Sequence, residues 1–229
     1  MIVIVNSHIP ASAQQALSRY AEVVPFATEG ITYPQLSGHA DIFMYQPSGA
    51  AQLVVAPNLP PRYLECLRAR AIPFSLGQTL VDASLSAVSA YNVASCAGLA
   101  IYNPQYIDAS IQLGDSVNRV LVRQGMCRCA ALVLDEHHVV TSDGGIAKAL
   151  AAQGVSVLAV DASPIRLPGY RCGCFGGCCG LAQGRLFIVG ALSYHPQGEA
   201  VRKFVAQVGY EVVELYDGPL FDAGSLLFI

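Results

Sequence analysis

The chain has 229 residues, of which 53% are hydrophobic and only 13% charged, and its formal net charge is −3. This balance suits one domain over residues 1–229 built from short strands buried on both faces, and the absence of a Lys/Arg cluster excludes a basic nucleic-acid-binding surface. No apolar run approaches the roughly 18 residues of a membrane span, and no basic region precedes the first apolar stretch, so we expect a cytoplasmic protein without a membrane or nucleic-acid partner.

An apolar hairpin, a short helix and an apolar strand follow one another in two predicted copies in the first half of the chain. The first copy consists of the hairpin GHADIFMYQPSGAAQLVVAP (38–57), a helix after Pro60 and Pro61, and the strand IPFSL. The second consists of the hairpin AYNVASCAGLAIYN, a short polar helix after Pro104, and the strand RVLVR. The repeated order indicates a repeat architecture.

The second half of the chain contains two more copies with clearer helix boundaries. The third combines GMCRCAALVLDEHHVVTSD, GGIAKALAAQG and VSVLAVD, and the fourth combines GCFGGCCGLAQGRLFIVGAL, a helix opened by Pro196, and YEVVEL. In the third copy Ser142 or Asp143 is predicted to cap the helix, since a short oxygen-bearing side chain can accept from free backbone N–H groups. Gly154 is the predicted stop of that helix.

The two ends of the chain together predict a fifth, split copy. The C-terminal FDAGSLLFI and the N-terminal MIVIVN would pair as its hairpin, followed by a helix over Ala11–Tyr20 and the strand AEVVPF. Five copies in 229 residues correspond to about 46 residues each, a period typical of propellers and other repeat arrays. The sequence therefore predicts an α/β ring of five units, closed by pairing of its terminal strands; the alternative is an ordinary α/β sheet.

The eight cysteines do not predict a disulfide framework, because no secretion signal accompanies them. The segment RCGCFGGCCG, which contains Cys172 to Cys179, brings four of them close together. Its spacing matches neither the paired CxxC of zinc ribbons nor a ferredoxin motif, and cysteine beside glycine is a good small apolar core residue. We therefore favour a packing role and predict no metal or other cofactor, with a thiol-based metal or redox centre as the alternative.

The five-fold order of elements resembles the pentein fold, the five-fold pseudosymmetric β/α-propeller of the guanidino-group-modifying enzymes. More narrowly, the segments GHADIFMYQ, VTSDGGIAK, RLPGYRCGCFGGCCG and FDAGSLLFI look like an uncharacterised bacterial family grouped with that superfamily. The resemblance implies a small-molecule ligand and, if the chain is an enzyme, a hydrolase or amidinotransferase.

The catalytic motifs of that superfamily are incomplete in this sequence. Such enzymes typically attack the guanidinium carbon with a cysteine in the last hairpin, use a histidine from an earlier repeat as acid and base, and hold the cation with carboxylates. Here the last hairpin reads Phe221-Asp222-Ala223-Gly224-Ser225, without a cysteine, and the third reads GMCRC, without a histidine. Neither catalytic residue can be transferred to this chain, so the resemblance alone leaves open whether it is an enzyme.

Several polar residues are nevertheless predicted to line a shared pocket, because the inner strand of each unit begins near the axis of such a ring. His39 and Asp41 are two residues apart and would face the same side of a strand. A cysteine of the fourth hairpin could pair with His39 as a relocated Cys–His couple. The predicted catalytic residues are His39, Asp41, Cys178 and Asp222, and the predicted ligand-binding residues are Asn92, Arg128, Cys179 and Ser225.

Three functions remain open from the sequence. One is a guanidino or amidino hydrolase or transferase, the second is a non-catalytic protein that binds a small cationic or polar ligand on the same ring, and the third is a metal or redox protein centred on the fourth-hairpin cysteines. A ring of this size has faces on which a homodimer could form, but no heptad pattern or apolar surface helix identifies one.

Overall fold

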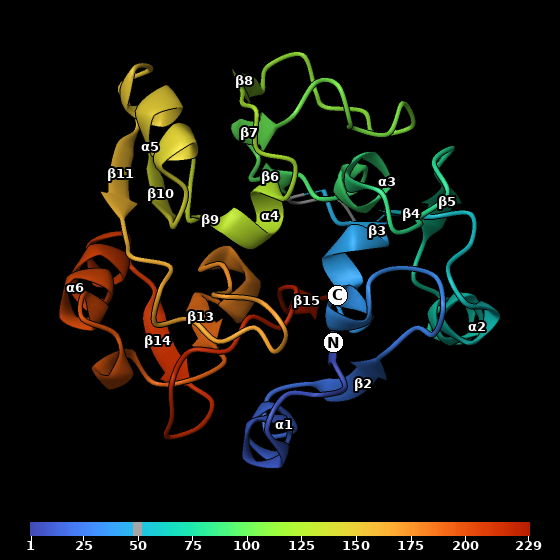
Figure 1. The fold of residues 1–229 in the computed structure, drawn as a ribbon, viewed down its shortest axis with the longest axis horizontal. Coiled ribbons are helices and arrows are strands. Elements are labelled where there is room, and N and C mark those ends of the chain that lie inside the picture. The colour runs from blue at the N-terminus through green and yellow to red at the C-terminus, as the bar shows by residue number, and fades with distance from the viewer. Residues whose placement is uncertain (48–51) are drawn as a thin grey trace.

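Five small sheets form a closed ring in the computed structural model, which describes residues 1–47 and 52–229 (Figure 1). Each sheet has three strands, and the middle strand pairs antiparallel with the first and parallel with the last. The predicted ring of five units is therefore confirmed. The turn of the first predicted hairpin includes residues 48–51, which lie outside the described residues.

The strands of the five sheets, given in spatial order, are β15 (Leu227–Phe228), β1 (Ile2–Asn6) and β2 (Glu22–Phe26); β3 (Met44–Tyr45), β4 (Leu53–Val55) and β5 (Phe74–Leu76); β6 (Ala94–Ser95), β7 (Leu99–Tyr102) and β8 (Asn118–Leu121); β9 (Ala131–Val133), β10 (His138–Thr141) and β11 (Ser156–Ala159); and β12 (Cys179–Ala182), β13 (Arg185–Ile188) and β14 (Glu211–Glu214).

The split unit closes the ring. Val3 of β1 lies opposite Phe228 of β15 in an antiparallel pair, and the backbone N–H groups of Ile2 and Ile229 donate to each other's carbonyl oxygens at 2.8 and 3.0 Å. Figure 1 shows the N and C labels next to each other near the middle of the ring. The two terminal strands thus satisfy each other's backbone groups at an edge that would otherwise be open.

Helices connect the parallel strands in four of the units: α1 (Ala11–Leu17), α2 (Pro61–Ala69), α5 (Gly144–Ala151) and α6 (Gly198–Gln207). The predicted cap of α5 is confirmed, since Asp143 Oδ1 accepts from the N–H of Ile146 at 2.8 Å. Gly154 follows the helix with a φ of 76°, as a C-terminal stop requires. No described helix is both long and apolar enough to cross a membrane.

The predicted helix after Pro104 in the second unit is wrong, because the described residues 103–117 form turns. Two side chains hold these turns. Asn103 Oδ1 accepts from the N–H of Gln105, and Asp108 Oδ1 accepts from the N–H of Ser110, each at 2.9 Å. Asn and Asp that bond to the backbone two residues further on compete with helix formation.

Short helical turns precede the first strands of several units. They are η2 (Ala40–Ile42) before β3, α3 (Leu85–Ser89) before β6, α4 (Cys127–Ala130) before β9 and η3 (Gly176–Cys178) before β12; the two remaining short helices are η1 (Pro34–Leu36) and η4 (Leu192–Tyr194). The sequence predicted strand at several of these positions. In two of them the turn brings a polar side chain to the axis: Asp41 of η2 and the thiol of Cys129 in α4 meet there in a hydrogen bond.

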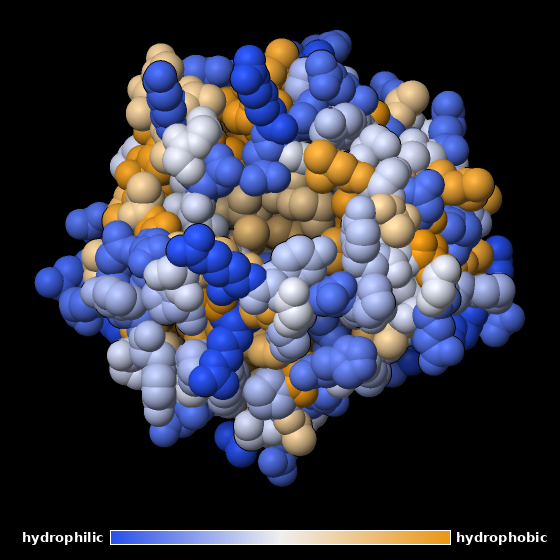
Figure 2. Space-filling view, in the orientation of Figure 1, coloured by the Kyte–Doolittle hydropathy of each residue, from blue (hydrophilic) through white to orange (hydrophobic). Residues whose placement is uncertain are grey.

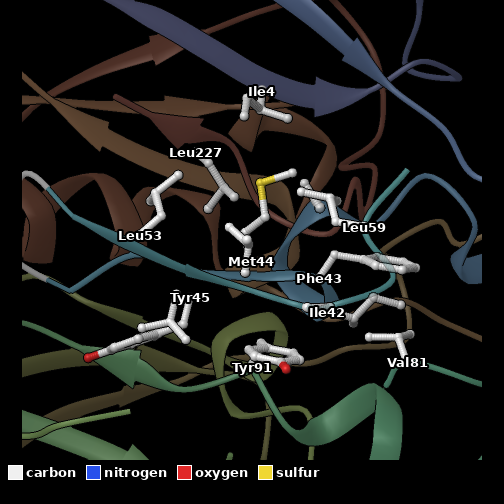
Figure 3. Packing of buried hydrophobic residues seen from close by; sticks show 14 of the residues in the cluster. Ile4, Ile42, Phe43, Met44, Tyr45, Leu53, Leu59, Val81, Tyr91 and Leu227 are labelled. Atoms are coloured by element: carbon white, nitrogen blue, oxygen red, sulfur yellow. The ribbon is translucent and has the colours of Figure 1, made fainter. Parts of the chain in front are cut away.

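The core consists of four apolar clusters, each of which joins neighbouring units. The largest joins the split, first and second units, and Figure 3 shows Met44 between Ile4 and Leu227 on one side and Tyr91 on the other. Each unit therefore buries apolar residues against the next unit as well as between its own sheet and helix. Cys178 and Cys179 belong to the cluster between the third and fourth units.

Close packing explains the glycine-rich segment of the fourth unit. A Cβ at Gly177 would overlap the carboxylate of Asp222, and one at Gly176 would overlap the backbone carbonyl oxygens of Arg128 and Ala131. A side chain at either position would push the fourth unit away from its neighbours. These glycines therefore serve close packing, at a 3-10 turn that leads into β12.

Candidate functional site

Five polar side chains meet at the axis of the ring, where the first strands of the units begin. His39 and Asp41 come from the turn at η2, Cys129 from α4, and Asp222 and Ser225 from the segment before β15. Each of these residues is at most 3% exposed to solvent. Segments far apart in the sequence therefore build one dry, polar cluster, which we call the axial cluster.

Asp41 is the hub of hydrogen bonding in the axial cluster. Its Oδ2 accepts from the thiol of Cys129 at 3.0 Å and from the hydroxyl of Ser225 at 2.9 Å. The other carboxylate oxygen, Oδ1, is buried without a hydrogen-bond partner. Ser225 is held in place at a φ of 65°, a backbone conformation that is uncommon for a residue with a side chain and that concentrates at functional sites.

Asp222 faces the imidazole of His39. Its Oδ1 lies 3.3 Å from Nε2 of His39 and accepts from the N–H of Gly224 at 3.1 Å, while its Oδ2 accepts from the N–H of Cys174 at 2.8 Å. The Nε2 contact is close enough for an ion pair, but neither ring nitrogen of His39 makes a well-aligned hydrogen bond. Gly224, at a φ of 65°, packs flat against the imidazole, where a Cβ would overlap the ring.

Burial and charge set the protonation of the cluster. Burial by itself lowers the pKa of His39, but the contact with Asp222 and then the charge of Asp41 outweigh it, so that the pKa lies above its ordinary value. Burial, followed by the charges of Asp41 and Asp222, raises the pKa of the Cys129 thiol well above its ordinary value. At rest the cluster therefore favours a protonated imidazole and a neutral thiol.

Asn92 positions the turn that carries Cys129. Its Oδ1 accepts from the backbone N–H groups of Arg128 at 2.7 Å and of Cys129 at 3.1 Å, and its Nδ2 lies 3.4 Å from Cys129 Sγ. These bonds satisfy two donors at the start of α4 that the short helix cannot satisfy itself. The ligand-binding residue predicted from the second unit thus fixes a neighbour from the third.

We expect Asn92→Ala to lower the free energy of unfolding by about 1–3 kcal/mol, because it leaves the buried N–H of Cys129 without an acceptor, while the N–H of Arg128 keeps only the backbone carbonyl oxygen of residue 92. Chemical denaturation followed by circular dichroism measures this loss. Asn118→Ala, on the exposed surface of β8, is the matched control and should change stability by less than about 0.5 kcal/mol. Equal losses in both variants would contradict the positioning role of Asn92.

A cavity of about 710 Å³ runs beside the axial cluster and is lined by residues from the first strands of all five units. Asp41 and Arg128 are the charged side chains of its lining. The guanidinium of Arg128 donates to the carbonyl oxygens of Gly176 and Cys179 at 3.2 and 3.3 Å. Figure 2 shows that the face seen in Figure 1 is hollowed near its middle, with moderately hydrophobic residues on the floor and a rim of mixed, mostly hydrophilic character.

The structure brings together most of the residues predicted for the site. The predicted cysteines, Cys178 and Cys179, are not among them, and Cys129 lies there instead. His39, Asp41, Asp222 and Ser225 lie in the axial cluster, and Asn92 and Arg128 lie beside it. Cys178 and Cys179 are buried in an apolar cluster, and their thiols donate to the backbone carbonyl oxygens of Cys174 and Phe175.

The thiol that lies near His39 belongs to Cys129, which no pattern in the sequence singled out. One signal could have found it: Cys129 lies in the segment of the third hairpin where the pentein enzymes have their histidine. His39 and Asp41 also share the site for a different reason than predicted, since His39 precedes a 3-10 turn and Asp41 lies within it, rather than both lying on one face of a strand.

Comparison with protein families places the whole ring in one group. Residues 4–227 match a family described as "Family of unknown function (DUF6873)". The chain belongs to this family. A search of curated proteins finds no match. The family thus extends over both halves of the split unit and all four internal units.

Solved structures similar to this chain include two enzymes of guanidino metabolism. Agmatine deiminase from C. jejuni has a TM-score of 0.53 at 7% identity, covering 93% of this chain and 87% of that one. A mutant DDAH from Pseudomonas aeruginosa, complexed with citrulline, has a TM-score of 0.50 at 12% identity, covering 93% and 91%. A dimethylarginine dimethylaminohydrolase adduct with 4-chloro-2-hydroxymethylpyridine gives 0.50 at 13%, with the same coverage. The ring of this chain is the pentein fold.

Proposed function

We propose that this chain is a cytoplasmic protein that acts on a small guanidino or amidino compound, as a hydrolase or an amidinotransferase, in the axial cluster. One observation carries the proposal: a donor atom each of His39, Cys129 and Asp222 lies within 4.8 Å of the others, in the buried centre of the ring. A thiol beside an imidazole that a carboxylate orients is the arrangement of a nucleophile with its proton shuttle. The structural neighbours support the substrate class, since their names state action on agmatine and on dimethylarginine.

The charges of the axial cluster favour a cationic ligand. Two buried carboxylates, Asp41 and Asp222, face a single imidazole, and Asp41 Oδ1 lacks a partner. A guanidinium or amidinium group carries N–H donors in a plane and pairs well with carboxylate oxygens. The cavity that Asp41 lines provides room for the rest of the ligand.

The reaction we propose uses each residue in one role. The sulfur of Cys129 forms a bond to the amidino carbon while the thiol proton passes to Asp41, its hydrogen-bond acceptor. The bond between this carbon and the departing nitrogen breaks, and His39 gives the leaving amine its proton. A positive ligand near the thiol lowers the cost of forming a thiolate, which the empty site disfavours.

Water then attacks the same carbon and gives a proton to His39. The carbon–sulfur bond breaks, and Cys129 recovers its proton from Asp41. The remaining proton on the product passes to the released ammonia, so that a guanidinium ion and water yield a ureido compound and an ammonium ion. In a transferase an amine takes the place of water.

Turnover of guanidino and amidino compounds tests the proposal directly. We expect the wild-type protein, kept in a metal chelator, to release ammonia or an amine from at least one compound, and Cys129→Ser to lower the rate by roughly a thousandfold or more. Cys178→Ser is the matched control, because that thiol is equally buried but outside the cluster, and it should retain activity. Equal turnover by wild type and Cys129→Ser would contradict the role of Cys129.

The raised pKa of Cys129 favours a second function, that of a non-catalytic protein that binds a small cation. In that case the same compounds would raise the melting temperature, as ligands that bind only the folded state do, and the rise would vanish in Asp41→Asn, but no product would form. Binding without turnover in every compound would decide for this second function.

A further inference from the structure

The axial cluster contains polar atoms that the protein itself does not satisfy. Both ring nitrogens of His39 and Oδ1 of Asp41 lack hydrogen-bond partners, although the two residues are 0% and 1% exposed. Buried polar groups in native proteins nearly always have a partner, and each exception calls for an explanation, such as a catalytic role or a bound water or ion. Even with His39 protonated, the two carboxylates of Asp41 and Asp222 leave one negative charge uncompensated within the cluster, which is costly in a dry interior.

We propose that His39, Cys129 and Asp222 bind a divalent transition-metal ion of the zinc type. One donor atom from each of the first three residues already lies within 4.8 Å of the other two. Nε2 of His39 and Oδ1 of Asp222 are 3.3 Å apart, and two ligands bound to tetrahedral zinc at about 2.0–2.1 Å are separated by about 3.3 Å. The histidine and the carboxylate therefore already have the separation that the metal requires.

The donor set selects the class of metal. An imidazole nitrogen, a thiolate sulfur and carboxylate oxygens are the ligands of zinc, and of cobalt as its substitute, whereas magnesium and calcium prefer oxygen alone. Binding would take the thiol proton from Cys129 and release the extra proton of His39. The thiol proton stays in the cluster on Asp41, its hydrogen-bond acceptor, so that the charges of one thiolate and the Asp222 carboxylate balance those of the ion.

Neighbouring groups hold the proposed ligands in orientation. Asp222 Oδ2 accepts from the N–H of Cys174, Asn92 Oδ1 accepts from the N–H of Cys129, and Gly224 packs against the ring of His39. Outer-shell bonds of this kind fix ligand geometry in metal sites. The cavity that Asp41 lines offers an entry path.

This site differs from a thiol cluster at Cys172–Cys179, since it uses one cysteine, from the third unit. It shares residues with the proposed reaction but does not depend on it, because metal binding needs the cluster alone and no turnover. A chelated protein that fails to turn over any compound leaves the metal proposal standing, and a protein that binds no metal leaves the reaction standing.

Titration of metal-stripped protein with Co²⁺ tests the site, because a cobalt–thiolate bond gives a charge-transfer absorption band in the near ultraviolet. We expect one equivalent to bind wild type with this band and Zn²⁺ to displace it. Cys129→Ser should abolish the band, and His39→Gln should weaken binding by roughly a hundredfold or more. Cys178→Ser, the matched buried thiol, should bind as wild type does.

X-ray absorption of the zinc-loaded wild type provides a test that no misfolded variant can obscure. We expect one sulfur and otherwise nitrogen and oxygen ligands around zinc. Two or more sulfur ligands would overturn the proposal in favour of the fourth-unit cysteines. Failure of wild type to bind Co²⁺ or Zn²⁺, or an unchanged cobalt band in a folded Cys129→Ser, would also overturn it.

Discussion

Deletion of residues 226–229 is expected to abolish cooperative folding, which is the largest effect that the architecture predicts. The deletion removes β15, so that β1 loses its antiparallel partner and the ring opens. Leu226, Leu227 and Phe228 are all buried, and the loss of three such side chains costs roughly 5–9 kcal/mol. Because a domain of ordinary stability has about 5–15 kcal/mol in total, we expect no sigmoidal transition in urea-induced unfolding followed by circular dichroism.

A circular permutant separates the effect of ring closure from that of shortening the chain. Ile2 and Ile229 already face each other as a hydrogen-bonded pair, so a short turn should join residue 229 to residue 1. New ends can be placed between Gln183 and Gly184, in the exposed turn between β12 and β13. We expect this permutant to unfold cooperatively. A deletion variant as stable as wild type would show that β15 does not close the ring.

The architecture could be predicted because each unit repeats the same local pattern. Apolar runs bounded by turn residues identified the strands, and the split unit followed from the order of elements at the two ends of the chain. The second unit departed from the pattern at Asn103 and Asp108, whose side chains bond to the backbone nearby and hold turns where a helix was expected. Local side-chain chemistry of this kind overrides the repeat.

The chemistry of the site was harder to predict because it depends on contacts between distant segments. Asp41 meets Cys129 across 88 residues and Ser225 across 184. On a strand, Cys127 and Cys129 would point the same way, but in the helical turn α4 they diverge. The thiol of Cys127 donates to the carbonyl oxygen of Gln124, and that of Cys129 to Asp41. No periodicity in the sequence distinguishes these two cysteines.

Asp222→Ala is expected to cost about 3–5 kcal/mol of the free energy of unfolding, the loss typical of breaking a buried ion pair. The carboxylate accepts from the N–H groups of Cys174 and Gly224 and faces His39, and all of these interactions are lost together. Chemical denaturation at neutral pH, in the presence of a chelator, measures the loss. Asp222→Asn retains the shape and an acceptor oxygen and should be less destabilised. A loss below about 1 kcal/mol in Asp222→Ala would contradict the role of this carboxylate.

The pH dependence of stability tests the charge of the pair separately from its packing. The folded-state pKa of His39 is raised, so its stabilisation is fully present below the unfolded-state pKa, near 6.5, and is lost as the pH rises through the folded-state pKa. In Asp222→Asn the largest raising influence is gone, and burial then lowers the pKa of His39. The stabilisation in this variant is present above the unfolded-state pKa and is lost as the pH falls.

The difference in unfolding free energy between wild type and Asp222→Asn should therefore shrink as the pH rises above about 6.5, since the other histidines cancel in the comparison. A difference that is constant from acid to alkaline pH would show that the imidazole carries no extra charge in the folded protein, and that Asp222 acts through its hydrogen bonds to the backbone alone.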